Sequence, residues 1–154
     1  MMKKTQNTYS PPVKLTERVR VSYKESPAHV GALRHSVDFI VAKGTPVYAA
    51  ADGVVVDLKQ DSSRGGESKE FEPAGNYIEI KHDHDEYSEY EHLRLNGACV
   101  AKGETVRRGQ VIGYTGATGW LAHLGPHLHF MVGKYGKTVQ DYKTLEIVWD
   151  RQLP

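Results

Sequence analysis

Three features that would narrow the function of this 154-residue chain are absent from its sequence. It has one cysteine, Cys99, which excludes a fold held by internal disulfide bonds, and we expect Cys99 to be a small buried residue. No apolar run approaches the length needed to span a bilayer. Lys3 and Lys4 are not followed by an apolar segment, so no signal peptide is readable as written. The protein is therefore expected either to stay in the cytoplasm or to be exported by a signal that was removed from this sequence.

A bias toward one sign of charge is also absent. The 20 basic and 19 acidic residues give a net charge of +1, so electrostatics gives no reason to expect nucleic acid or an anionic membrane as a partner. The hydrophobic content of 39% fits a single globular domain. Residues 1–12 are polar and end in two prolines, so we expect a flexible lead-in followed by one domain over residues 13–154.

Short apolar runs separated by glycine, proline and asparagine dominate the chain, and no long stretch has apolar residues at helical spacing. The pattern predicts an all-β fold, an antiparallel sheet or sandwich with long loops and little helix. Residues 59–75 form the longest predicted loop, and the tail, 138–149, is compatible with a strand or a short helix. The predicted strands lie within 13–23, 37–41, 47–51, 54–58, 77–82, 87–93, 100–116 and 127–132.

The stretch Gly125–Phe130 carries two histidines, His127 and His129, separated by one residue. Side chains alternate along a strand, so both imidazoles would point to one face while Leu128 and Phe130 point into a core. A strand that holds two imidazoles near one point is half of a zinc site, because zinc binds neutral imidazole together with a carboxylate or a third histidine.

Asp38 is the candidate carboxylate, because it is the one charge within the apolar segment 37–41. A buried charge is costly unless it is paired or binds a metal, although Asp38 would also be tolerated facing solvent on an edge strand. His29 and His35 are the candidate third ligands. If residues 35–41 form one strand, His35 and Asp38 point to opposite faces, which favours His29 from its loop. His35 stays the alternative.

His92 is a candidate for proton transfer, because histidine titrates near neutral pH. In a regular strand it would share a face with Tyr90. As an isolated residue it would equally serve a structural role. We expect His82, His84 and His123 at exposed turn or loop positions, and we assign them no function.

Five separated blocks of the chain, in the same order, resemble the lysostaphin-type zinc metallopeptidases, which are endopeptidases of bacterial peptidoglycan. The resemblance covers about residues 29–132. The first block consists of Gly31–Phe39 and Gly44–Val55. The other four blocks are Gly75–His82, Tyr90-x-His92-Leu93, Val106–Gly119 and Gly125–Phe130.

The resemblance implies an antiparallel sheet with a site in a groove, walled by loops near residues 59–75 and 117–124. It implies one zinc per chain, held by Asp38 and His129, with His92 and His127 as catalytic histidines and a peptidoglycan peptide as substrate. The commonest family pattern has its first zinc histidine where this chain has Arg34, which cannot ligate zinc. A family branch with longer spacing resembles His29-Val30-Gly31, so His29 is the expected first ligand.

The implied chemistry is hydrolysis of a peptide bond by zinc-activated water, with proton transfer by His92 and His127. A non-catalytic binding or regulatory module on the same fold is the alternative, motivated by Arg34 and the lack of a signal peptide. A lipoyl-like carrier hairpin is a weaker alternative, because no lysine is placed at a hairpin tip and the histidines would have no role.

Overall fold

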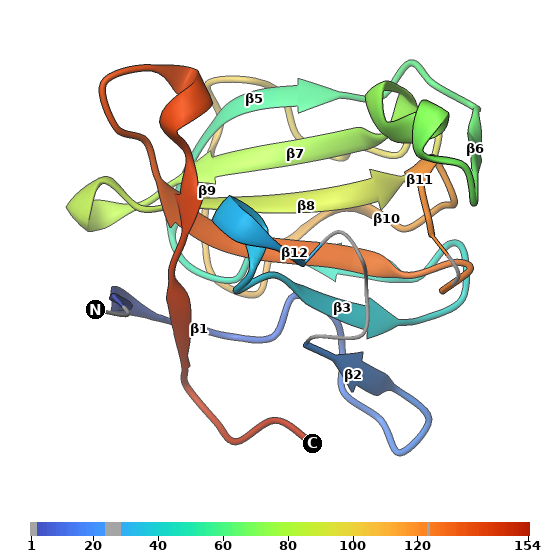
Figure 1. Ribbon diagram of the computed structural model, residues 1–154. Coiled ribbons are helices and arrows are strands. Elements are labelled where there is room, and N and C mark those ends of the chain that lie inside the picture. The colour runs from blue at the N-terminus through green and yellow to red at the C-terminus, as the bar shows by residue number, and fades with distance from the viewer. Residues whose placement is uncertain (1–2, 24–28, 123) are drawn as a thin grey trace.

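The computed structural model describes residues 3–23, 29–122 and 124–154, and one large antiparallel sheet dominates it (Figure 1). The strand order is β2-β3-β12-β8-β7-β5-β9, with β13 beside β12. The strands are β2 (Arg20–Ser22), β3 (Val37–Ile40), β5 (Gly53–Lys59), β7 (Asn76–Lys81), β8 (Tyr87–Leu93), β9 (Thr105–Val106), β12 (Leu128–Lys134) and β13 (Lys143–Thr144).

Three small strand pairs complete the β-structure. They are the parallel pair β1 (Lys4–Tyr9) with β14 (Glu146–Trp149), the antiparallel pair β4 (Pro46–Tyr48) with β10 (Val111–Tyr114), and the parallel pair β6 (Gly65–Gly66) with β11 (Gly119–Trp120). The helical turns are η1 (Gly31–Leu33), η2 (Lys69–Ala74), η3 (Asp83–Asp85) and η4 (Val139–Asp141). The all-β prediction is confirmed, and the described part of the chain has no helix long and apolar enough to cross a membrane.

The hydrophobic core lies on one face of the large sheet. Leu128 and Phe130 of β12 are fully buried in it, as the alternation predicts. Phe130 pairs with Val37 and Leu128 with Phe39, and each buried side chain of this size contributes about 1.5–3 kcal/mol. The residues between them, including Asp38 on β3, therefore point to the opposite face.

The start of the chain is a correction to the sequence prediction. The flexible lead-in expected over residues 1–12 is wrong for Lys4–Tyr9, which forms β1 beside β14. The fully buried carboxylate of Glu86 accepts hydrogen bonds from the backbone N–H of Gln6 at 2.7 Å and from the Tyr9 hydroxyl at 3.0 Å. A distant carboxylate orders this polar segment, which local composition does not reveal.

Two further local expectations change with the structure. The tail contains both candidate elements, because η4 is followed by β13 and β14. Cys99 is exposed rather than buried. Its backbone N–H bonds to the carbonyl of Ile112 at 2.8 Å, so the main chain, not the thiol, anchors this position.

The two loops expected to wall a groove lie side by side. β6 belongs to the 59–75 loop and β11 to the 117–124 loop, and the two strands pair directly near the end of β8 (Figure 1). The backbone N–H of Gly119 donates to the carbonyl of Arg64 at 3.0 Å. The two loops therefore form a single wall at this end of the sheet.

Candidate metal centre

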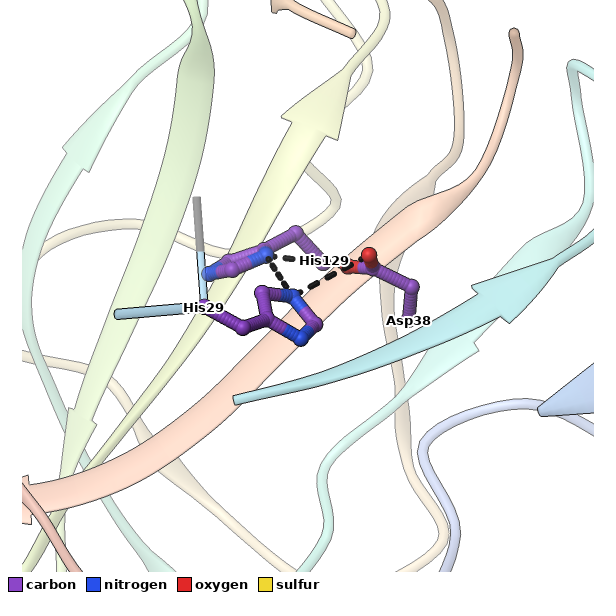
Figure 2. A group of neighbouring side chains, drawn as sticks. All are labelled: His29, Asp38 and His129. Atoms are coloured by element: carbon purple, nitrogen blue, oxygen red, sulfur yellow. Dashed lines mark hydrogen bonds and ion pairs between the residues drawn. The ribbon is translucent and has the colours of Figure 1, made fainter. Parts of the chain in front are cut away.

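Three buried side chains from separate segments converge on the face opposite the core (Figure 2). His29 precedes η1, Asp38 lies on β3 and His129 lies on β12. Asp38 Oδ1 is 2.9 Å from His129 Nδ1, and Asp38 Oδ2 is 3.1 Å from His29 Nε2. The two ring nitrogens, His29 Nε2 and His129 Nδ1, are 3.4 Å apart. The structure thus brings together the three residues that the sequence analysis selected as candidate zinc ligands.

The sheet fixes two of the three groups. His129 pairs directly with Asp38 across β12 and β3, and side chains at paired positions lie on the same face. β3 is not an edge strand, since β2 pairs with its other side and Ser22 is opposite Asp38. The solvent-facing alternative for Asp38 is therefore wrong, and its side chain is 0% exposed.

The hydrogen bonding of His29 leaves its second ring nitrogen as a ligand atom. Nδ1 lies 2.7 Å from the carbonyl oxygen of Tyr23, which can only accept, so Nδ1 carries the proton. In the neutral ring, Nε2 then presents a lone pair toward Asp38 Oδ2, a buried oxygen with no hydrogen bond within the described residues. A cation bound between two facing acceptors relieves their repulsion, so this pair of atoms suits a metal ion.

Electrostatics keeps Asp38 ionised. Burial alone would raise its pKa, but the hydrogen bond from His129, the adjacent His29 ring, and the charges of His129 and His127 hold the pKa well below its usual value. For His129 burial would lower the pKa, but the carboxylates of Glu91 and Asp38 raise it overall. An anionic carboxylate with two imidazole nitrogens is a donor set that zinc accepts with an open fourth position.

His92 and His127 lie beside this cluster with their rings edge to face, 4.5 Å between centroids. Each donates from Nδ1 to a backbone carbonyl at 2.7 Å, His92 to Thr118 and His127 to Gly125. His127 Nε2 is 3.7 Å from Asp38 Oδ1. Burial, reinforced by neighbouring histidine charge, lowers the pKa of His92 to about 3, and burial also lowers that of His127. Both rings are therefore neutral, with an unprotonated Nε2, at neutral pH.

A β-bulge brings His92 into the site. Asn76 pairs with Leu93 but Tyr77 pairs with Glu91, so His92 is the extra residue of β8. Its φ of 69° is rare for a non-glycine residue. The expectation that Tyr90 and His92 share a face is therefore wrong. Tyr90 is buried in the core, and the bulge turns His92 toward His129.

The other described histidines, His35, His82 and His84, do not join the cluster. His35 precedes β3 and its backbone N–H bonds to Thr144 Oγ1 at 3.1 Å, away from Asp38. His82, expected in an exposed turn, is buried, and its ring nitrogens lie 2.7 Å from the Asp52 carbonyl and the Ser88 hydroxyl. His84 is exposed in η3, as expected, and His123 lies outside the described residues.

One polar neighbour was missed by sequence reasoning. Glu91 Oε2 lies 3.4 Å from His129 Nε2, the ring nitrogen that points away from Asp38. Glu91 is the unspecified residue of the Tyr90-x-His92-Leu93 block, so the motif gave no reason to select it. Its position opposite His129 follows only from the register of β8 against β12.

Comparisons with known proteins identify relatives of this chain. Residues 32–141 match peptidase family M23. The chain is 38% identical over 112 residues to the peptidoglycan DD-endopeptidase ShyA of Vibrio cholerae, covering 73% of this chain and 23% of that protein. It is 35% identical over 111 residues to the DD-carboxypeptidase/endopeptidase Mpg of Neisseria meningitidis, covering 72% and 22%. The chain thus spans less than a quarter of the length of these relatives.

Solved structures resemble the fold as well. A zinc-containing peptidase from Vibrio cholerae superposes with a TM-score of 0.58 at 28% identity, covering 96% of this chain and 41% of that one. The catalytic domain of lysostaphin from Staphylococcus simulans gives a TM-score of 0.56 at 27% identity, covering 81% and 87%. His29 precedes the segment that matches the family, so its assignment rests on the distances to Asp38 and His129.

Proposed function

Because the chain belongs to peptidase family M23, we propose that it is a zinc-dependent endopeptidase that hydrolyses peptide bonds in peptidoglycan cross-links. The observation that carries the proposal is the convergence of Asp38 with the ring nitrogens of His29 and His129, beside a second pair of buried histidines. The peptidoglycan substrate is supported by the names of relatives such as ShyA. With that substrate, the protein would act in the cell envelope.

The proposed metal ligands are His29 Nε2, the Asp38 carboxylate and His129 Nδ1, for one zinc per chain. Asp38 Oδ2, which has no hydrogen bond in the described part of the chain, and the lone pair of His29 Nε2 fit this role. Bound zinc would supply a Lewis acid that polarises the scissile carbonyl and makes water acidic near neutral pH.

His92 and His127 would move the protons. Their Nδ1 atoms are held by backbone carbonyls, so Nε2 of one ring accepts a proton as the water oxygen bonds to the carbonyl carbon. When the C–N bond breaks, the same imidazolium returns this proton to the departing amine. Before that, the imidazolium would donate from Nε2 to the negative oxygen of the tetrahedral species, and the other, neutral ring would accept a hydrogen bond at Nε2 from its hydroxyl group.

Zinc content measured by elemental analysis, followed by peptidoglycan hydrolysis, tests the proposal. We expect one equivalent in the wild type and in His35→Ala, which is the matched control, and loss of zinc in His29→Ala. The zinc-loaded wild type should release peptides from purified peptidoglycan. Wild-type protein without tightly held zinc would favour the non-catalytic module. Zinc-loaded protein that cleaves no cell-wall preparation would refute the peptidoglycan substrate.

A further inference from the structure

The histidines around the metal centre differ in what orients them. A neutral backbone carbonyl accepts a hydrogen bond from Nδ1 of three of the rings, whereas the fourth ring, that of His129, faces a carboxylate at Nε2. The three pairs are His29 with Tyr23, His92 with Thr118 and His127 with Gly125; the fourth pair is His129 Nε2 with Glu91 Oε2, at 3.4 Å.

His129 lies between two carboxylates that come from the two strands flanking β12. It pairs with Asp38 of β3 on one side and with Glu91 of β8 on the other. Nδ1 faces Asp38 and Nε2 faces Glu91. The three positions form one line across the sheet, so strand pairing, rather than a loop, sets the distance of Glu91 from the ring.

We propose that Glu91 is a positioning residue that orients His129 and strengthens metal binding at its Nδ1; this inference rests on the proposed function. A ligand nitrogen must be unprotonated, so the proton of His129 has to reside on Nε2. Glu91 accepts that N–H, which fixes the tautomer and the ring orientation. Its negative charge also makes the imidazole a stronger donor, as carboxylates behind metal-bound histidines do in general.

Glu89 provides a matched control on the same strand and face. It lies two positions before Glu91 and pairs with Met131, not with His129. Both glutamate side chains are partly exposed, so replacing either one removes a carboxylate from a similar setting. A general effect of surface charge on zinc binding would therefore appear in both variants.

The test compares zinc dissociation constants, from chelator competition, for the wild type, Glu91→Ala, Glu91→Gln and Glu89→Gln. We expect Glu91→Ala to raise the constant about 10- to 100-fold, the usual effect of removing such a partner. Glu91→Gln should have a smaller effect, because its amide oxygen still accepts the N–H. Glu89→Gln should match the wild type. Imidazole ¹⁵N shifts should show the His129 proton on Nε2 in the zinc-loaded wild type.

Equal zinc affinity for Glu91→Ala and Glu89→Gln would overturn the role of Glu91, as would a proton on Nδ1. Thermal unfolding of the metal-free variants tests whether each is folded. A lower zinc affinity in a folded variant cannot be caused by unfolding. If the wild type binds zinc and Glu91→Ala binds it equally well, only this inference fails. If the wild type binds no zinc, the proposed function fails with it.

Discussion

A side chain at Gly119 would crowd His92, so replacing Gly119 by alanine should impair the site without touching a proposed metal ligand. Its φ is +85°, and an added Cβ would lie 2.7 Å from Gly75 Cα and 3.2 Å from His92 Nδ1. Gly109 has the same φ of +85° with no heavy atom within 4 Å of an added Cβ. The pair Gly119→Ala and Gly109→Ala therefore separates backbone strain from crowding.

The expected magnitudes follow from these contacts. An alanine in the left-handed backbone conformation should lower the free energy of unfolding by about 1–2 kcal/mol, and no further loss is expected for Gly109→Ala. Overpacking against Gly75 adds about 1–3 kcal/mol, so Gly119→Ala should lower the free energy of unfolding by about 2–5 kcal/mol. The displaced His92 ring loses its 2.7 Å hydrogen bond to the Thr118 carbonyl. A misplacement of about 1 Å can reduce turnover about 100-fold.

Urea unfolding of the two variants measures the difference in their free energies of unfolding. Elemental analysis measures their zinc content, and a peptidoglycan hydrolysis assay measures their activity. Gly119→Ala should keep its zinc and lose activity, whereas Gly109→Ala should keep both. Equal losses of stability, or full activity in folded Gly119→Ala, would refute the reasoning that the Gly119 backbone holds His92 in place.

Three further predictions concern His92, His127 and Glu86. His92→Gln and His127→Gln should each retain zinc, while kcat for peptidoglycan hydrolysis falls about 10²- to 10⁴-fold. Loss of zinc from either variant would instead indicate that the replaced histidine is a metal ligand. Since burial lowers the pKa of His92 to about 3, its stabilising contribution is complete above the unfolded pKa of about 6.5 and declines as the pH falls toward 3. The metal-free wild type should thus lose about 2 kcal/mol more than His92→Gln between pH 7 and 5, and parallel pH profiles in urea unfolding would contradict this. Glu86→Gln should destabilise the fold by about 1.5–3 kcal/mol and expose the β1 amides to hydrogen exchange, and unchanged exchange would show that Glu86 does not anchor β1.

The sequence predicts those parts of the site that depend on local geometry. Alternation along a strand placed His127 and His129 together because successive side chains of a strand point to opposite faces. The same rule separated His35 from Asp38, and the structure places His29 beside Asp38 instead. The rule failed at His92, because one extra residue in β8 reverses the face and no local signal marks a bulge.

Features that depend on distant partners were not predictable from one sequence. β1 is polar, and its order comes from Glu86, far along the chain. Glu91 gains its position from the register between β8 and β12, which no residue of the Tyr90–Leu93 block determines alone. Alternation predicts which face a side chain occupies, whereas strand order determines which side chains it meets.

The pairing of β6 with β11 makes the two loops beside His92 a single mechanical unit. The backbone N–H of Leu121 donates to the Gly66 carbonyl at 2.9 Å, and the Thr118 hydroxyl accepts from the N–H of Asn76 at 3.0 Å. A loop graft intended to change the specificity of the proposed peptidase would therefore have to exchange residues 62–75 and 116–121 together. Replacing one loop alone would shift the Thr118 carbonyl, and with it the ring of His92.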